Sequence, residues 1–200
     1  IGPHPDDIEF GCGGTLIKYI KAGHRVFLLV LTDGSYGGSR KTRMREQKEV
    51  VRFAGASGLY WGGYKDTQLE ANRALISKIE GVIRKVKPDA VFLNYEDDIH
   101  QDHRAAAKAG ISATRYIKEV LFYEVPTTRR FDPDTFVDIR FALDKKLKLL
   151  ELHSSQIDKT RVKSLTIIEM AEACATFRGF QGRVKYAEGF KALRVIRDVR

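Results

Sequence analysis

Residues 25–31 read RVFLLVL, a run in which every side chain after Arg25 is apolar. Such a run is typical of a β-strand that is covered on both faces, as in a parallel sheet. On its N-terminal side, residues 13–22 carry apolar side chains at helical spacing. On its C-terminal side, the Gly- and Ser-rich residues 32–41 predict a loop, and residues 42–54 predict a helix.

The same alternation continues along the chain. Short apolar runs predict strands at 59–61, 90–94 and 120–125, and periodic segments predict helices at 71–87 and 103–118. Alternating strands and helices imply βαβ units with right-handed crossovers. We therefore expect an α/β, Rossmann-like three-layer fold, with a mostly parallel central sheet and helices on both faces.

The C-terminal third is less regular. It predicts helices at 140–152 and 165–177 and a last strand at 192–196. A chain of 200 residues suits one domain. We therefore expect residues 1–200 to form a single domain, in which 1–125 are the core βα units and 126–200 are additions to it.

Composition excludes several classes of protein. Hydrophobic residues make up 43% of the chain, enough to bury a core, and no stretch approaches a membrane span of about 18–20 apolar residues. The net charge is +9, but the basic residues are spread along the chain and are not interleaved with aromatics. This pattern favours a solvated basic surface over nucleic-acid binding.

Cysteine use predicts the compartment. Cys12 and Cys174 are far apart and form no CxxC pair, so neither a disulfide scaffold nor a thiolate zinc site is expected. No secretory signal pattern opens the chain, and we expect a cytoplasmic protein. The first residue is Ile1 rather than Met, which leaves a preceding segment open.

Two polar clusters stand out, HPDDIE at residues 4–9 and HQDH at residues 100–103. Each is expected between a strand and a helix. In open sheets of this kind, ligands bind beyond the carboxyl ends of the strands. We therefore expect the loops at 4–9, 32–40 and 97–103 to share one rim of the sheet.

Imidazole and carboxylate together bind a divalent metal, and His with Asp suits zinc in particular. A catalytic zinc takes three protein ligands and keeps one position for water. Asp6 and Asp7 are adjacent and cannot easily point the same way, so one is expected to be a ligand and the other a general base. Of the two histidines in the second cluster, one would bind metal and one would face charge developing on the substrate.

Other interpretations exist for each cluster alone. His-Pro-Asp-Asp could be a turn, either aspartate could cap a helix, and the two histidines of the second cluster could lie on the surface. The joint occurrence of both clusters at strand–helix junctions favours a metal site. His24 and His153 lack such neighbours and are expected to be structural. The glycines at 11–14 and 34–38 lack the spacing of a nucleotide-binding loop.

Together these motifs resemble the LmbE-like, or PIG-L, family of zinc-dependent N-acetylglucosamine deacetylases. The resemblance covers nearly the whole chain. It is carried by HPDDIEFGCGGTL at 4–16, TDG at 32–34, RMREQ at 43–47, YKD at 64–66, HQDHRAA at 100–106, HSSQ at 153–156 and YAEGF at 186–190.

The resemblance implies roles by position. His4, Asp7 and His103 would hold Zn²⁺, although Fe²⁺ could serve the same ligands. Asp6 would be the general base that activates water. His100 would stabilise the tetrahedral oxyanion or protonate the leaving amine. The residues before His100 do not supply the tyrosine that some relatives place nearby, so further oxyanion donors stay open.

Four other residues receive roles from the same resemblance. Asp102 would orient a metal-binding histidine from outside the ligand set. Arg43 and Asp66 would face the sugar, with a surface or loop-pinning role as the alternative. Tyr186 would also contact substrate, and a core tyrosine is the simpler interpretation.

The expected function is hydrolysis of an N-acetylglucosamine-type sugar or sugar conjugate, a small-molecule substrate, with release of acetate. Two alternatives stay open: a hydrolase of another amide on the same metal site, and a metal- or sugar-binding protein without activity. Neither nucleic acid nor a membrane is an expected partner. A homo-oligomer is plausible for the family, although no interface can be identified in the sequence.

Overall fold

Most of the apolar run at residues 25–31 lies in β1 (Phe27–Thr32), whose last five residues are buried. In the computed structural model, which describes residues 1–196, β1 pairs in parallel with β2 (Gly58–Tyr64). β3 (Ala90–Asn94) pairs in parallel with β4 (Glu119–Tyr123). The predicted parallel strands are confirmed, with β2 longer than the expected segment 59–61.

Residues 1–3 join the two parallel pairs. The backbone N–H of Gly2 donates to the carbonyl of Leu29 over 2.9 Å, and the Ile1 amino group donates to the carbonyl of Phe92 over 2.8 Å. Because these bonds reach β1 on one side and β3 on the other, the strands form one continuous layer. His4 therefore leaves this layer at its centre, next to the carboxyl end of β1.

The C-terminal strands run antiparallel. β6 (Ala187–Arg194) lies between β4 and β5 (Thr135–Asp138) and is antiparallel to both. The predicted last strand, 192–196, was placed too late, because Glu188 and Gly189 interrupt the apolar pattern of β6. β5 was not predicted, since it has four residues and all are only half-buried.

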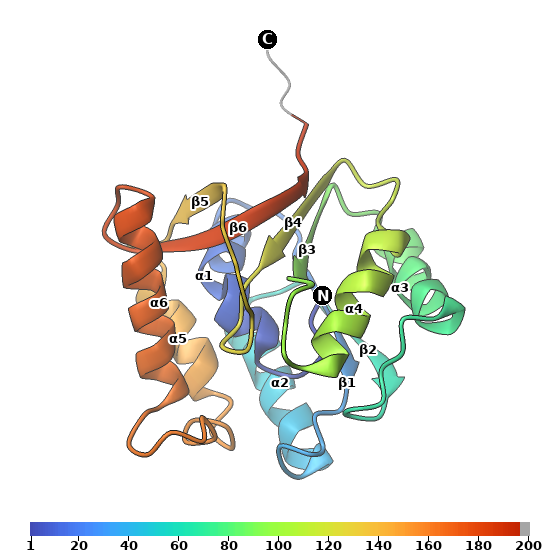
Figure 1. Cartoon of the computed structure of the whole chain (residues 1–200), viewed down its shortest axis with the longest axis horizontal. Helices are drawn as coiled ribbons and strands as arrows, with labels where there is room; N and C mark the ends of the chain where they lie inside the picture. The colour runs from blue at the N-terminus through green and yellow to red at the C-terminus, as the bar shows by residue number, and fades with distance from the viewer. Residues whose placement is uncertain (197–200) are drawn as a thin grey trace.

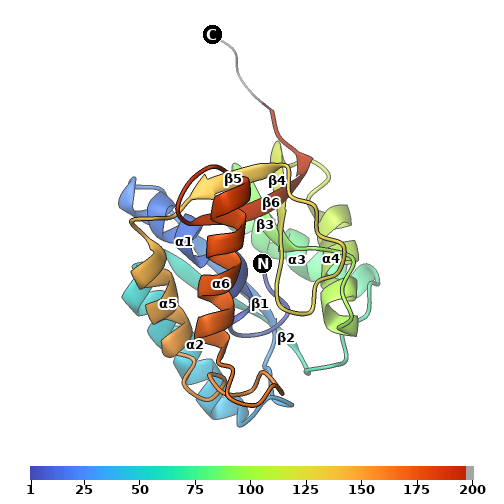
Figure 2. The same cartoon turned by 60° about the vertical axis from the view of Figure 1, so that its left-hand side comes forward.

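Helices cover both faces of the sheet (Figures 1 and 2), as the three-layer expectation requires. One face carries α3 and α4, and the other carries α1, α2, α5 and α6. Apolar side chains pack on each face, such as Leu31 with Ile79 and Val30 with Phe190. The helices are α1 (Asp7–Lys21), α2 (Arg40–Ala54), α3 (Arg73–Val86), α4 (Gln101–Ala113), α5 (Leu143–Glu151) and α6 (Ile167–Gln181).

Two helices begin earlier than the sequence predicted, and both shifts concern the polar clusters. α1 begins at Asp7 instead of residue 13, and α4 begins at Gln101 instead of residue 103. The sequence did not show where either helix begins, because Asp and other polar residues are common both at the end of a loop and in the first turn of a helix. Asp7 and His103 therefore project from first turns of helices, not from loops.

Helix α1 is kinked at Cys12, whose φ of −143° is not helical. The kink interrupts the helical hydrogen bonds, and a buried ion pair satisfies the freed groups. Glu188 accepts the backbone N–H groups of Gly14 and Thr15 over 2.8 and 2.7 Å. Lys146 donates both to Glu188 and to the carbonyl of Phe10.

A cavity of about 400 Å³ opens between β1 and β3, lined by apolar residues such as Ile8, Leu28 and Val91. None of the predicted site residues lines it. Within residues 1–196, no helix has both the length and the apolar character needed to cross a membrane.

Candidate metal centre and active site

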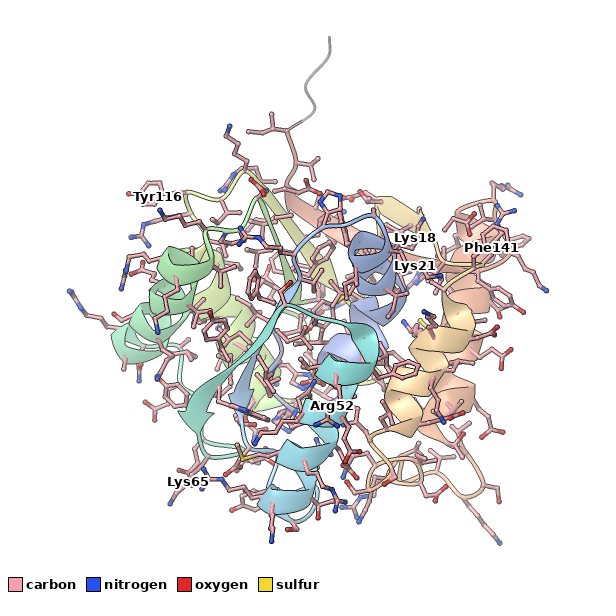
Figure 3. The ribbon with its side chains drawn as sticks, turned by 180° about the vertical axis from the view of Figure 1, so that it is seen from behind. Lys18, Lys21, Arg52, Lys65, Tyr116 and Phe141 are labelled. Carbon is pink, nitrogen blue, oxygen red and sulfur yellow. The ribbon has the colours of Figure 1, made fainter. Side chains whose placement is uncertain are left out.

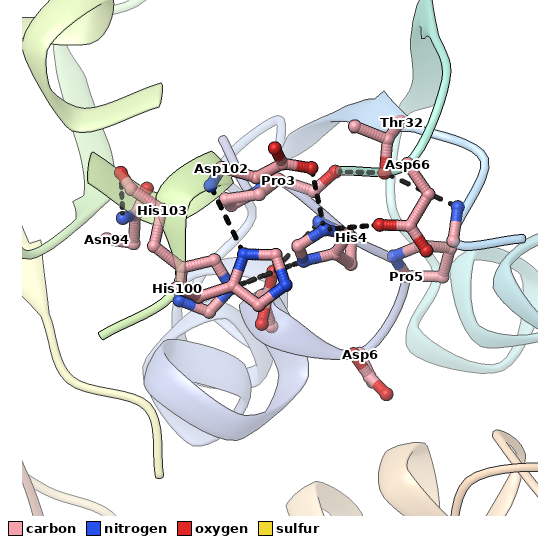
Figure 4. A network of polar contacts seen from close by, with 12 residues as sticks. Pro3, His4, Pro5, Asp6, Thr32, Asp66, Asn94, His100, Asp102 and His103 are labelled. Atoms are coloured by element: carbon pink, nitrogen blue, oxygen red, sulfur yellow. Dashed lines mark hydrogen bonds and ion pairs between the residues drawn. The ribbon is translucent and has the colours of Figure 1, made fainter. Parts of the chain in front are cut away.

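Three side-chain atoms from distant parts of the chain converge at the carboxyl end of the sheet. His4 Nδ1 lies 3.2 Å from Asp7 Oδ2 and 3.2 Å from His103 Nε2. The remaining side of the triangle, between His103 Nε2 and Asp7 Oδ2, is 3.4 Å. All three residues are buried, with at most 8% of their surface exposed. Figure 4 shows the rings of His4, His100 and His103 gathered together.

The triangle has the dimensions of a metal site. Tetrahedral zinc with ligand distances of about 2.0–2.1 Å separates its donor atoms by about 3.3–3.4 Å. The three observed separations match that spacing within about 0.2 Å, the tolerance expected of such a site. Two imidazole nitrogens and one carboxylate oxygen form a donor set that suits Zn²⁺ and also Fe²⁺. The residues therefore fit a divalent transition metal.

Two wider triplets share donors with this one. The ligand atoms of His4, His100 and His103 lie within 4.8 Å of one another, as do those of His4, Asp66 and Asp102. Both carboxylates of the second triplet face Nε2 of His4, at hydrogen-bond distances. We therefore treat them as partners of the imidazole and the tighter triangle as the ligand set.

His4 is oriented by carboxylates on its far side. Asp102 Oδ2 lies 3.1 Å and Asp66 Oδ1 3.0 Å from His4 Nε2. A proton held on Nε2 by these carboxylates leaves the Nδ1 lone pair free for a metal. Asp102 is itself fixed by the backbone N–H groups of Thr67 and Leu69. The placement of Asp102 beside a ligand histidine is the arrangement that the sequence analysis expected.

His103 has a corresponding partner that the sequence analysis missed. Asp98 Oδ2 lies 3.1 Å from His103 Nδ1, and Asp98 also accepts the backbone N–H of His100 and the hydroxyl of Thr128. Asp98 is 3% exposed. The sequence offered one indication of this role, the position of Asp98 two residues before His100 in a polar loop. An aspartate at such a position is also common in turns, so the indication was weak.

The charges of the cluster shift the pKa values of His4, His103 and Asp7. Burial alone would lower the pKa of His103, but the carboxylates of Asp7 and Asp98 outweigh it and raise the value to about 9. The pKa of His4 is likewise raised despite burial, by Asp102, Asp66 and Asp7. Burial would raise the pKa of Asp7, but the two imidazoles hold it well below its usual range. The site is thus an anionic pocket that favours cations.

Asp6 points away from the triangle, as Figure 4 shows. Its backbone has a φ of 101°, in the left-handed region, so that its side chain diverges from that of Asp7. Its carboxylate lies 3.4 Å from Arg43 Nη1, and a quarter of the side chain is exposed. Burial raises the pKa of Asp6, the guanidinium of Arg43 opposes that shift, and the charge of Asp7 adds to it.

Arg43 and Asp66 make contacts with the protein itself. Arg43 is 3% exposed and donates from Nη2 to the carbonyl of Pro5 over 2.6 Å. Asp66 is 4% exposed, and its second oxygen accepts the backbone N–H of Tyr36 over 2.9 Å. These contacts match the loop-pinning alternative rather than a sugar-facing position.

His100 lies beside both ligand histidines. Its ring stacks on that of His103 with centroids 4.8 Å apart and meets that of His4 edge-on at 4.7 Å. Its Nδ1 accepts the backbone N–H of Asp102 over 3.2 Å, which leaves Nε2 to carry the proton of the neutral ring. Burial and the two neighbouring imidazoles lower the pKa of His100. It can therefore donate a hydrogen bond as a neutral group.

A second buried polar group lies behind Asp6 and was not expected as such. His153, fully buried, has Nε2 3.5 Å from Glu9 Oε2, and Gln47 donates to the other oxygen of Glu9 over 2.7 Å. The sequence analysis assigned His153 to structure, and its ion-pair partner recorded within residues 1–196 is Glu9. Burial would lower the pKa of His153, but Glu9 raises it.

Tyr186 is not brought to the cluster. Its ring packs among the apolar residues around Ile139 and Leu143, and its carbonyl accepts the backbone N–H of Ile139. No hydrogen bond recorded within residues 1–196 joins it to a predicted metal ligand. This position fits the core-tyrosine interpretation, and the substrate contact implied by the resemblance stays a prediction.

Comparisons with known proteins identify similar deacetylases. The family model described as PIG-L, GlcNAc-PI de-N-acetylase, matches residues 1–114. A diacetylchitobiose deacetylase from Thermococcus kodakarensis is 30% identical over 229 residues, covering 96% of this chain and 80% of that protein. The solved structure of the N,N'-diacetylchitobiose deacetylase from Pyrococcus horikoshii has a TM-score of 0.83 and 27% identity, covering 96% of this chain and 81% of that one.

The fold also occurs with other chemistry. A 4-carboxy-2-hydroxymuconate hydratase from Pseudomonas putida KT2440 has a TM-score of 0.83 at 20% identity, covering 100% of this chain and 97% of that one. At this identity the likeness concerns the fold alone. The fold by itself therefore does not choose between amide hydrolysis and other reactions, and the residues of the cluster must do so.

Proposed function

The chain belongs to the PIG-L family, and from this premise we propose that it is a metal-dependent deacetylase of an N-acetylglucosamine-type sugar or sugar conjugate. The observation that supports the proposal most is the triangle of His4 Nδ1, Asp7 Oδ2 and His103 Nε2, with sides of 3.2, 3.2 and 3.4 Å. A metal site of this kind, with a carboxylate outside the ligand set in the adjacent position of the chain, suits metal-assisted hydrolysis.

His4, Asp7 and His103 would hold Zn²⁺ or Fe²⁺ in this proposal. Such an ion supplies positive charge that polarises the acetamide carbonyl and brings the pKa of a water molecule from 15.7 to near 7. The protein contributes orientation, because Asp98 and Asp102 fix the two imidazoles from behind.

Asp6 is the general base of the proposed reaction. Its raised pKa brings it closer to the range in which a base accepts and returns a proton at neutral pH. Asp6 would take the proton of the attacking water and deliver it to the departing amine. Arg43 holds this carboxylate and the preceding Pro5 carbonyl, and so keeps the side chain in place.

His100 stabilises the developing negative charge. Its Nδ1 is occupied by the backbone of Asp102, so the proton on Nε2 is available for the oxygen of the tetrahedral intermediate. Loss of one such donor typically reduces kcat by about 10²–10³.

The test combines metal analysis with an assay of acetate release. The substrates are N-acetylglucosamine, N,N'-diacetylchitobiose, N-acetylglucosamine glycosides and simple acyl amides. We expect the wild-type protein to hold about one equivalent of zinc or iron and to release acetate from N-acetyl sugars in preference to simple amides.

Two variants separate the assigned roles. Asp6→Asn should keep the metal and lose about 10²–10⁴ in kcat, whereas His103→Gln should lose the metal itself. Equal metal loss in both would contradict the division between base and ligand. Preference for simple amides would favour the alternative hydrolase, and metal binding without any acetate release would favour a binding protein.

Three expectations stay predictions. A cytoplasmic location agrees with two free cysteines, Cys12 buried in α1 and Cys174 half-buried in α6. The single-domain organisation of residues 1–200 and a homo-oligomeric state also remain to be measured.

A further inference from the structure

The loop of residues 33–39 is connected to His4 through Asp66, on the side of the imidazole that faces away from the metal triangle. The backbone N–H of Tyr36 donates to Asp66 Oδ2 over 2.9 Å, and Asp66 Oδ1 lies 3.0 Å from Nε2 of His4. One carboxylate thus connects the backbone of Tyr36 with a predicted ligand. The position of Tyr36 is therefore tied to the position of His4.

The same loop also packs on the Asp6 side. A Cβ on Gly34 would lie 2.9 Å from Arg43 Nε and 2.9 Å from Pro5, and a Cβ on Gly37 would lie 3.3 Å from Arg43 Nη1. Only glycine permits this approach at Gly34, where φ is +63°. Tyr36 is thus held between the contacts of Gly34 and Gly37 on Arg43, the residue that pairs with Asp6.

A further contact fixes the loop from the C-terminal third. Gln156 donates to the carbonyl of Gly37 over 3.2 Å, and the N–H of Gly37 itself donates to the carbonyl of Gly34. The backbone of the loop is accordingly hydrogen-bonded to Asp66 and to Gln156, and it packs on Arg43. A loop that is fixed in this way holds Tyr36 in a preorganised position for contact with a ligand.

The ring of Tyr36 has no comparable partner. It is 75% exposed, and no hydrogen bond of its hydroxyl is recorded within residues 1–196. Ile99, which precedes His100, is 63% exposed and places a second apolar side chain at the other polar cluster. Exposed apolar side chains next to a buried polar site are a feature of ligand-binding rims.

We propose that Tyr36 is a specificity-determining residue that stacks against a second ring of the substrate, one joined to the acetylated sugar. The inference rests on the proposed function. The metal-ligand residues are at most 8% exposed and would receive the acetamide, whereas Tyr36 is 75% exposed. What reaches Tyr36 is therefore the part of the substrate that extends outward, and a tyrosine offers that part a flat apolar face at low entropic cost.

The experiment compares a disaccharide with a monosaccharide. For each protein, kcat/KM is measured with N,N'-diacetylchitobiose and with N-acetylglucosamine, and the ratio of the two values is taken. In Tyr36→Ala this ratio should fall about three- to tenfold through a higher KM for the disaccharide. Tyr36→Phe, which keeps the ring, should retain the wild-type ratio within about twofold.

The matched control is Tyr116→Ala. Tyr116 is also an exposed tyrosine, at 85%, and Figure 3 shows it at the other end of the molecule from Lys65, the neighbour of Asp66. Its ratio should equal that of the wild type. The inference is overturned if Tyr36→Ala behaves like this control, or if Tyr36→Phe falls as far as Tyr36→Ala.

A binding measurement separates the inference from the proposed function. Calorimetric titration of the metal-depleted protein with N,N'-diacetylchitobiose needs no turnover. A Kd raised about three- to tenfold in Tyr36→Ala supports the stacking role even where no acetate is released, in which case only the proposed function fails. Equal Kd values for the disaccharide and N-acetylglucosamine in the wild type overturn the inference.

Discussion

Two neighbouring aspartates receive different environments because the backbone at Asp6 takes a positive φ of 101°. Such a conformation typically costs a non-glycine residue about 1–3 kcal/mol. Local bonds hold it: His4 N–H donates to Asp7 Oδ2 over 2.8 Å, and Arg43 donates to the Pro5 carbonyl. The strain separates two carboxylates that would otherwise repel each other at one site, so that one can serve the metal and one the proton.

At this scale, the carboxylate behind His103 should control metal affinity. Asp98→Asn removes the charge that orients the ring through Nδ1, and we expect metal affinity to fall about 10–100-fold. Competition with a chromophoric chelator measures the change. Asp97→Asn is the matched control, because Asp97 pairs with Arg130, whose side chain is 77% exposed, and it should keep wild-type affinity. Equal losses in both variants would show that Asp98 has no specific part.

Metal binding should also release protons. In the metal-free protein the pKa of His103 is raised to about 9, and the pKa of His4 is also raised. Because a proton and a metal ion compete for the same nitrogen, metal affinity should rise with pH up to about 9, with release of at least one proton at pH 7. Calorimetry in buffers of different ionisation enthalpy counts them. Release of no protons would contradict the pKa directions.

At the scale of the element, α1 is two helical segments joined at Cys12. The first segment presents Asp7 to the site, and the second begins where Glu188 accepts the N–H groups of Gly14 and Thr15. A carboxylate at a helical N-terminus is favourable both for its hydrogen bonds and for the helix dipole. The kink therefore lets a short helix begin directly at the metal site and still pack along the sheet.

Alanine substitution should have opposite effects on stability at two helical glycines, one in α1 packed closely against the sheet and one in α3 with open space around it. A Cβ on Gly11 would lie 2.0 Å from the ring of Tyr123, which is fully buried. Gly11→Ala should therefore destabilise the protein by about 3 kcal/mol or more. Gly81, in α3, has only the tip of Arg84 within 4 Å, so Gly81→Ala should stabilise by about 0.5–1 kcal/mol. Urea unfolding measures both, and a loss of stability in Gly81→Ala comparable to Gly11→Ala would refute the packing argument.

At the scale of the whole molecule, the C-terminal third is bonded to the part that carries the metal site. Lys146 reaches the carbonyl of Phe10 in α1, and His153 faces Glu9 one helical turn after Asp6. Glu46 of α2 accepts hydrogen bonds from Ser154 and Ser155. These contacts connect residues more than 100 positions apart. They lie on the Asp6 side of the site, opposite the histidines. They support the single-domain organisation that we propose.

The buried ion pair provides the test of this connection. Lys146→Met leaves Glu188 buried without its cation, and we expect a loss of about 3–5 kcal/mol in the free energy of unfolding. Lys148→Met, two residues further along α5 in a pair whose side chains are 52% and 45% exposed, should change the free energy of unfolding by less than about 0.5 kcal/mol. Urea denaturation compares the two. A mild effect of Lys146→Met would mean that α1 does not depend on the C-terminal third.

The sequence by itself determined the alternation of strands and helices and the two polar clusters at the rim. Both are local properties: the periodicity of apolar residues reports the element, and the residue types within four or five positions report the donor chemistry. The local pattern left open which aspartate and which later histidine would be ligands, and the family resemblance selected His4, Asp7 and His103. The fold brings their donor atoms within 3.4 Å of one another.

Only the tertiary structure decided which groups stand behind those donors. Asp98 reaches His103 because α4 starts two residues earlier than expected, and Glu188 meets Gly14 because β6 is inserted antiparallel beside β4. Tyr186, by contrast, lies just before β6 and packs against the apolar cluster around Ile139. Such contacts depend on the packing of elements far apart in the chain, where no local pattern records which side chains will meet.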